Sequence, residues 1–520
     1  MSESVQHSWQ IRKPAVTSKK GMVASQHYLA SEAGVEILRL GGNAVDAAIT
    51  TGLTLGVVEP WMSGIGGGGY MAIYIAATQE VKIIEFGMQA PAAAEPHDYP
   101  LANSGSNSKE SFNWPKVVDD TNIHGPMAAA VPGYIKGISL ALENFGTMNW
   151  RDVFEPACRH AELGLPIDWF SAQKISLISR GLRLYPETRR TYLADGLPPT
   201  INLNGTIDHL MLGKLPETYR RLQATSEAEF YKGDLAKTIV SDLNEAGSKI
   251  SVEDLRNYRA SISQPISIPY RGSTLHVSGP LTAGPSIALA MTQLQDQYQP
   301  GEKPDKETFK QYAAALLDAY GHRLANLGEG QSGNTSHLCV TDRDGNMVSL
   351  TQTIMSAFGS RIMLPRSGIL MNNGMMWFDP RPGGPNSVAS SGKPLCNMCP
   401  VILSGKDGSH TAIGACGGRK IFPAVFQLAS LITDFGLSAE AAAHHPRIDV
   451  SGTDQITVMD HMDNAVINAI RGEYPNVMVS PNGVSPNLFA LPQIIKRENN
   501  GVAEGACFIP SPHAKVIAAD

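Results

Sequence analysis

Residues 335–355 read TSHLCVTDRDGNMVSLTQTIM, and this stretch decides the fold. Two runs of alternating side chains, 335–342 and 347–355, flank the turn residues Asp344-Gly345. An Asp-Gly pair between two alternating runs predicts a β-hairpin. Its register stays open at this point. A three-residue loop sets Thr335 opposite Thr353, whereas a two-residue loop sets Ser336 opposite Thr353 and sends Thr335 to the other face.

The segment before the hairpin, 328–334, has no apolar side chain and contains three glycines. We expect it to be an exposed, mobile joint that ends at Thr335. A threonine hydroxyl needs a base within hydrogen-bond reach before it can attack an amide. A free α-amino group, with a pKa near 8, is such a base, but Thr335 gains one only if the chain is cut between Asn334 and Thr335.

Around the hairpin the pattern mixes helices and strands. Helical spacing predicts a helix over 24–40, a second, Ala-rich helix through Leu55, and a mainly helical region over 133–262. Residues 70–75 and 81–86 predict an antiparallel strand pair. A strand over 273–277, a helix through Gln295 and a helix over 308–327 complete the expected elements; residues 92–125 predict a long surface excursion.

Composition excludes several classes of protein. The chain has 520 residues, 42% of them hydrophobic, and a net charge of −6 with scattered basic residues, so we expect no nucleic-acid or membrane partner. No apolar run near the N-terminus predicts a signal peptide or a membrane span, and six cysteines are too few for a disulfide scaffold. These features together predict a cytoplasmic location.

Motifs along nearly the whole chain resemble the γ-glutamyltranspeptidase family. The most specific are Asn334-Thr335-Ser336-His337, Asp344-Gly345-Asn346, Asn372-Asn373 and Gly417-Gly418. Others are Gly21 to Ser25, Gly41 to Ala48, Glu59-Pro60, Gly64 to Gly69, Val131-Pro132-Gly133 and Tyr270-Arg271-Gly272.

The resemblance implies an α+β fold, the four-layer αββα sandwich of N-terminal-nucleophile (Ntn) hydrolases, with two packed, mainly antiparallel sheets. It also implies self-cleavage between Asn334 and Thr335 into a large subunit (1–334) and a small one (335–520) that stay together in one unit. Thr335 would then be the nucleophile that forms an acyl-enzyme with a small-molecule amide. Thr353 would orient its hydroxyl, and the amides of Gly417 and Gly418 would hold the oxyanion; no metal or organic cofactor is implied.

The expected substrate-binding positions depart from the family pattern. The arginine that binds a glutamyl α-carboxylate is replaced by Gly87, and the serines that assist it by Cys396 and Asn397. The positions that hold the α-ammonium are Met355, Gly374 and Trp377, which carry no charge; Asn373 precedes Gly374 within the shared motif. Losing both charged anchors predicts poor binding of a glutamyl zwitterion. The segment over 378–393 is also shorter than the family's lid-bearing stretch, which favours hydrolysis over transfer.

Several substrate classes therefore stay open. Relatives with altered pockets include oxamate amidohydrolases, poly-γ-glutamate depolymerases and cephalosporin acylases, and a true glutathione-type hydrolase or transpeptidase is a further alternative. Arg419, just after the oxyanion glycines, could meet a small carboxylate such as oxamate. Met355 and Trp377 instead suggest large apolar acyl groups. A rival from another class is an uncleaved, non-catalytic homologue.

Other motifs favour structural roles. The glycines of 64–69 match a dinucleotide fingerprint but lead into a strand instead of a helix. Cys396 and Cys399 lack a second ligand pair at zinc-like spacing, and His444-His445 lies at an expected helix end. Neither a GxSxG elbow nor an HExxH helix is present, so a common serine hydrolase or zinc peptidase is not indicated.

Overall fold

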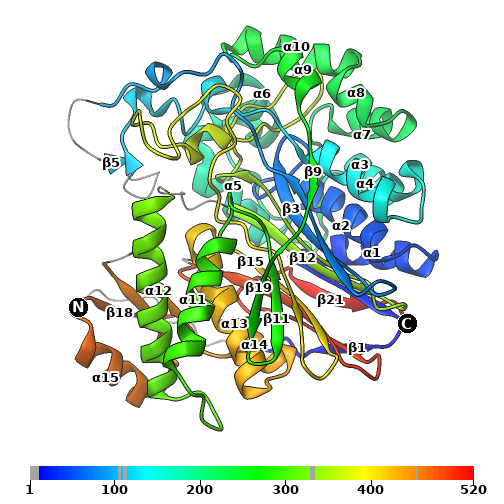
Figure 1. Cartoon of the computed structure of the whole chain (residues 1–520). Coiled ribbons are helices and arrows are strands. Elements are labelled where there is room, and N and C mark those ends of the chain that lie inside the picture. Colours follow the sequence, from blue (N-terminus) through cyan, green and yellow to red (C-terminus); the bar gives the residue numbers. More distant parts are fainter. Residues whose placement is uncertain (1–10, 103–106, 109–113, 328–333, 453, 486) are drawn as a thin grey trace.

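A computed structural model describes residues 11–102, 107–108, 114–327, 334–452, 454–485 and 487–520. The expected mobile joint over 328–333 lies outside the described residues. Two seven-stranded sheets, built from antiparallel pairs, form the centre of the molecule (Figure 1).

The hairpin sheet contains the quoted stretch. Its strands, in spatial order, are β21 (Lys515–Ala518), β2 (Gly21–Ser25), β12 (Asn334–Asp342), β13 (Met347–Met355), β3 (Gly68–Ile75), β4 (Glu80–Phe86) and β9 (Ser261–Ser263). The predicted hairpin, the β3–β4 pair and their antiparallel arrangement are confirmed.

The partner sheet packs face to face against it. Its strands, in spatial order, are β1 (Val16–Ser18), β20 (Ala503–Cys507), β19 (Leu491–Arg497), β15 (His410–Cys416), β14 (Val401–Ser404), β11 (Ser273–Val277) and β10 (Ile266–Tyr270). Across the interface the Ser349 hydroxyl donates to the Ile413 carbonyl at 2.9 Å. A Cβ on Gly414 would lie 2.2 Å from Cε1 of His337, so a glycine lets β12 and β15 approach closely.

Helices cover the outer face of each sheet. Those nearest the hairpin sheet are α1 (Tyr28–Arg39) and α2 (Ala44–Val58), while α11 (Gly284–Gln297), α12 (Lys306–Asn326), α13 (Ile421–Phe435) and α14 (Ala439–His444) lie on the side of the partner sheet (Figure 1). All fifteen residues of α2 are buried, and Asn43 and Asp46 form a capping box at its start. The expected four-layer αββα architecture is thus confirmed.

A helical region and short strands complete the chain. Its helices are α3 (Tyr134–Phe145), α4 (Trp150–Leu163), α5 (Trp169–Leu182), α6 (Pro186–Tyr192), α7 (Leu215–Ala224), α8 (Glu227–Tyr231), α9 (Asp234–Ala246), α10 (Val252–Asn257) and α15 (Asn464–Glu473). Its strands are β5 (Asn107–Ser108), β6 (Trp114–Pro115), β7 (Leu165–Ile167), β8 (Asp208–Leu210), β16 (Ile448–Asp449), β17 (Ile456–Met459) and β18 (Val477–Ser480). No helix among the described residues is long and apolar enough to cross a bilayer.

One expected element was wrong. The helix expected over 24–40 begins only at Tyr28, because Gly21–Ser25 is strand β2. All five residues of β2 are buried, and the strand lies between β12 and β21. A strand buried on both faces shows no alternation, so its apolar residues merged with the helical pattern that follows.

Candidate active site

The hairpin has the register of a three-residue loop. His337 pairs with Thr351 and Ser336 with Gln352, and the Asp342 amide donates to the Asn346 carbonyl at 3.1 Å. This register corresponds to the alternative that sets Thr335 opposite Thr353. The pairing shifts between Asn334 and Ser336, so Thr335 lies at an irregularity at the start of β12.

Side-chain alternation assigns Thr335 and Thr353 to the face that meets the partner sheet. The next residues on that face are His337 and Thr351, and a hydrogen bond of 3.0 Å links Nδ1 of His337 to Oγ1 of Thr351. Thr335 and Thr353 are 3% and 1% exposed. The Thr353 hydroxyl accepts a hydrogen bond from the Met355 amide at 2.7 Å, which fixes its rotamer. Burial lowers the pKa of His337 to about 3, so this ring is neutral at physiological pH.

Gly417 and Gly418 join the end of β15 to α13. Their φ angles are +138° and +60°, a backbone region that favours glycine. A Cβ on Gly417 would lie 3.0 Å from Cα of Ala490, so no side chain fits there without displacing the backbone. The pair thus lies at the start of a helical segment. The first N–H groups of a helix have no acceptor within the helix and point out from its N-terminal end.

A buried polar network lies on the opposite face of β12, and the sequence reasoning missed it. The Ser336 hydroxyl donates to Oε2 of Glu59 at 3.2 Å and accepts from the Ser63 hydroxyl at 3.0 Å. Nε2 of Gln352 donates to Ser63 at 2.9 Å. Burial raises the pKa of Glu59 to about 8. The only sequence signal was the Glu59-Pro60 motif, which does not reveal these contacts.

The apolar substrate-binding positions predicted from sequence come together. Met355, Trp377 and Cys396 belong to one buried hydrophobic cluster that also contains Tyr70 and Met88. Gly374 begins a short helical turn beside it, where a Cβ would lie 3.0 Å from Sδ of Met88. This part of the chain is therefore an apolar wall without room for larger side chains.

Tyr70 occupies the space next to Gly87, which the sequence reasoning did not foresee. A Cβ on Gly87 would lie 3.1 Å from the Tyr70 hydroxyl, and that hydroxyl is hydrogen-bonded to the side chain of Cys396. The Gly87 carbonyl accepts from the Tyr258 hydroxyl at 2.6 Å. The Tyr70 hydroxyl thus fills the space between Gly87 and Cys396.

A buried arginine lies behind the Cys396-Asn397 pair and was also missed. Arg323 is 2% exposed, and its Nη2 donates to the Cys396 carbonyl at 2.8 Å and to Oδ1 of Asn397 at 3.2 Å. Its other donor, Nη1, reaches the Thr282 carbonyl at 3.0 Å. Burial lowers the pKa of Arg323, and repulsion from Arg419 acts in the same direction.

The remaining predicted positions support the loops around this wall. Asn373 accepts from the Ser356 amide at 2.9 Å and donates to the Ile123 carbonyl at 2.7 Å, so it holds the chain just beyond β13. Arg419 is half-buried in the turn before α13, and its carbonyl accepts from the Tyr320 hydroxyl.

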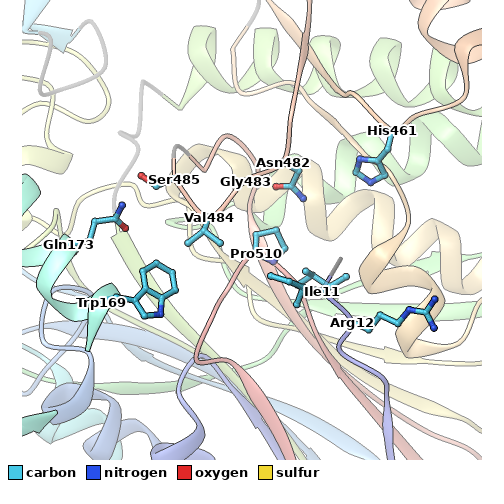
Figure 2. A pocket seen from close by; sticks show the side chains of 11 residues that line it. Ile11, Arg12, Trp169, Gln173, His461, Asn482, Gly483, Val484, Ser485 and Pro510 are labelled. Atoms are coloured by element: carbon cyan, nitrogen blue, oxygen red, sulfur yellow. The ribbon is translucent and has the colours of Figure 1, made fainter. Parts of the chain in front are cut away.

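A pocket of about 720 Å³ opens on the surface (Figure 2). It is lined by Trp169 and Gln173 from α5, by residues 482–485, and by Ile11, Arg12, His461, Ile509 and Pro510. The predicted site residues are not part of this lining. Across the described ranges, no cluster of three or more His, Cys, Asp or Glu side chains could hold a metal ion.

Comparison with known proteins gives a consistent result. The gamma-glutamyltranspeptidase family profile matches residues 30–332 and 326–507. The chain is 30% identical to the glutathione hydrolase proenzyme of Bacillus subtilis (strain 168), covering 88% of this chain and 86% of the relative. It is 28% identical to the acylase ACY 1 proenzyme of Pseudomonas sp. (strain SE83), covering 90% and 89%.

The fold matches solved structures. The crystal structure of cephalosporin acylase from Bacillus halodurans superposes with a TM-score of 0.86 at 23% identity, covering 100% of this chain and 99% of that one. The Helicobacter pylori gamma-glutamyltranspeptidase structure gives a TM-score of 0.52 at 27% identity, covering 62% and 86%. The first of these confirms the expected Ntn-hydrolase fold.

Proposed function

The chain belongs to the gamma-glutamyltranspeptidase family, whose members act on amide bonds, and on that premise we propose that it is a self-cleaving amidohydrolase with Thr335 as its nucleophile. The observation that carries this proposal is the hairpin register, which corresponds to Thr335 opposite Thr353 on the face toward the partner sheet. On that sheet, β15 ends at the Gly417-Gly418 turn.

Self-cleavage begins in the uncut chain. The Thr335 hydroxyl attacks the carbonyl carbon of Asn334, the Asn334–Thr335 amide bond breaks, and an ester to the hydroxyl forms as the Thr335 nitrogen takes up a proton. Water then hydrolyses the ester. This releases the carboxyl end of residues 1–334 and leaves Thr335 with a free α-amino group. The proenzyme names of the relatives support such processing.

Turnover uses the amino group that cleavage creates. It accepts the Thr335 hydroxyl proton as the oxygen attacks the substrate carbonyl. The oxyanion is held by the amides of Gly417 and Gly418, and the proton passes to the departing amine. Water hydrolyses the resulting acyl-threonine. Thr353, whose hydroxyl is already fixed by the Met355 amide, orients the nucleophile.

The acyl group is not a free glutamyl zwitterion. Met355, Trp377 and Cys396 stand at positions matched to its charged anchors, and Tyr70 packs with them in one apolar wall. An unpaired α-ammonium and α-carboxylate would lose their hydration against this wall without gaining partners. We therefore favour acyl groups that lack this pair of charges, with an apolar acylase-type substrate as the first candidate.

A small anionic acyl group is the second candidate, and Arg323 favours it. The guanidinium is buried against neutral acceptors, directly behind Cys396 and Asn397. Among the described residues Arg323 has no carboxylate partner, and a buried cation in that state lowers the cost of placing an anion nearby. Oxamate is the test substrate for a small anionic acyl group.

Arg419, the residue after the oxyanion glycines, is the second cation that could meet this anion. If Arg419 contributes, Arg419→Ala slows oxamate turnover at least tenfold but not the turnover of a neutral amide.

The test of the central proposal is the intact mass of purified protein beside Thr335→Ala. We expect two wild-type fragments, the smaller beginning at Thr335, and an uncut mutant. A single wild-type chain would contradict the proposal and favour the non-catalytic homologue. A panel of amides that vary in acyl size and charge, read by amine release, then separates apolar, small anionic and glutamyl acyl groups.

A further inference from the structure

Ser336, the residue after the proposed nucleophile, belongs to a series of hydrogen bonds that runs from Gln352 to Glu59. Nε2 of Gln352 donates to the Gly52 carbonyl and to the Ser63 hydroxyl, both at 2.9 Å. Because Ser63 accepts that bond, its own proton goes to the Ser336 hydroxyl, and the Ser336 proton goes to Glu59. Glu59 is therefore the terminal acceptor of the series.

We propose that Glu59 is a positioning residue for Thr335: its buried carboxyl anchors Ser336 and thereby sets the start of β12. This inference rests on the proposed nucleophile. Ser336 directly follows Thr335, and it is the first residue in regular pairing after the irregularity. An anchored Ser336 limits the rotation of the peptide unit that it shares with Thr335. The clamp acts from the helical side of β12, away from the face on which the chemistry is proposed.

The surroundings of Glu59 make the clamp sensitive to pH. Glu59 is 4% exposed, and the titratable groups that act on it are Lys174 from α5 and Cys416 from β15, with no ion pair among the described contacts. Burial raises the pKa of Cys416 to about 12, so that thiol stays neutral. The Glu59 carboxyl consequently holds its proton at neutral pH and loses it near pH 8. Ionisation strengthens the hydrogen bond from Ser336, because a charged carboxylate is the stronger acceptor, so the clamp tightens as pH rises through 8.

Self-cleavage provides an assay that needs no substrate and no free α-amino group. Chains made by cell-free translation at low temperature are transferred to buffers between pH 6 and 9.5, and the cut fraction is followed by gel. We expect the wild-type rate to rise at least fivefold through a midpoint near pH 8. Glu59→Gln, which keeps an acceptor for Ser336 but cannot ionise, should cleave within threefold of wild type at pH 7 and lose this step near pH 8.

Two variants remove the hydrogen bond itself. Glu59→Leu and Ser336→Ala should slow cleavage at least tenfold at pH 7. The matched control is Thr54→Val. Thr54 is a buried α2 residue whose hydroxyl, among the described contacts, donates to the Thr50 carbonyl of its own helix, and the variant should cleave within twofold of wild type.

Wild-type rates in Glu59→Leu and Ser336→Ala, or an unchanged step near pH 8 in Glu59→Gln, would overturn the clamp. If Glu59→Leu does not fold, the pH profile of Glu59→Gln still decides. If Thr335 is not the nucleophile, the result is different from a failure of the clamp. In that case Thr335→Ala would still be cut, or the wild-type chain would stay uncut at every pH.

Discussion

At the scale of single residues, the backbone conformation of Gly417 sets the direction of the amide that we propose binds the oxyanion. Its φ of +138° is one that L side chains rarely adopt, and a Cβ there would lie only 3.0 Å from Cα of Ala490. Gly417→Ala should rotate or displace its amide. Because loss of one oxyanion donor typically costs ~3 kcal/mol, we expect amide hydrolysis about 100-fold slower. The measurement is kcat/KM on the best amide of the substrate panel.

Gly436, at the other end of α13, is the matched control. It too has a positive φ, +64°, but no atom lies within 4 Å of the Cβ position. Gly436→Ala should lower the free energy of unfolding by about 1 kcal/mol and leave kcat/KM unchanged. Equal losses of activity in both variants would show that Gly417 has only a structural role.

At the scale of elements, the contact between β12 and β15 depends on Gly414. A Cβ there would lie within 3 Å of three atoms of the buried His337 ring, which is hydrogen-bonded to Thr351. The ring therefore has little freedom to move, and Gly414→Ala should cost about 1–3 kcal/mol of stability and slow self-cleavage. Urea unfolding and the cut fraction measure the two effects.

Gly321 in α12 provides the opposite expectation for the same substitution. No atom lies within 4 Å of its Cβ position, so Gly321→Ala should stabilise the protein by about 1 kcal/mol through helix propensity. If Gly414→Ala were as stable as wild type, the sheets would not be locked together at His337.

Local patterns predicted the elements that carry their own signal. The hairpin followed from alternation around Asp344-Gly345, and α11 and α12 from helical spacing. Strand β2 was misread because it is buried on both faces. Glu59, Tyr70 and Arg323 were missed because their partners lie far away in sequence, and a buried polar contact leaves no periodic pattern. Resemblance to a family supplied positions such as Gly87, but only the structure shows that Tyr70 fills the adjacent space.

At the scale of the whole molecule, the predicted cleavage point divides both sheets. In the hairpin sheet, β12 lies between β2 from the first segment and β13 from the second. Neither segment can complete a sheet alone, so we expect residues 1–334 and 335–520 to stay together after cleavage. Native mass spectrometry should give one particle with the summed mass, and residues 335–520 produced alone should be insoluble. Separate, folded fragments would contradict this prediction.

The dependence of the free energy of unfolding on pH tests whether Glu59 is buried with its proton. The measurement is best made in the Thr335→Ala variant, which we expect to stay uncut, because a single chain then unfolds. The pKa of Glu59 is raised from 4.5 to about 8 on folding, so between these values the folded state holds a proton that the unfolded chain has lost.

Stability therefore falls with rising pH in this window, by about 1.4 kcal/mol per pH unit for this one group. Burial also lowers the pKa of His27 and His337 to about 3, so the folded protein loses stability as pH drops below 6.5. Both histidines are present in Glu59→Gln and in its parent, so their contribution cancels when the two proteins are compared. In urea unfolding, the stability of Glu59→Gln relative to its parent should be constant below pH 4.5, rise up to pH 8 and level off above it. A difference that stays flat across the window would mean that Glu59 is ionised in the folded protein, and the hydrogen-bonded clamp on Ser336 would then be an ionic one.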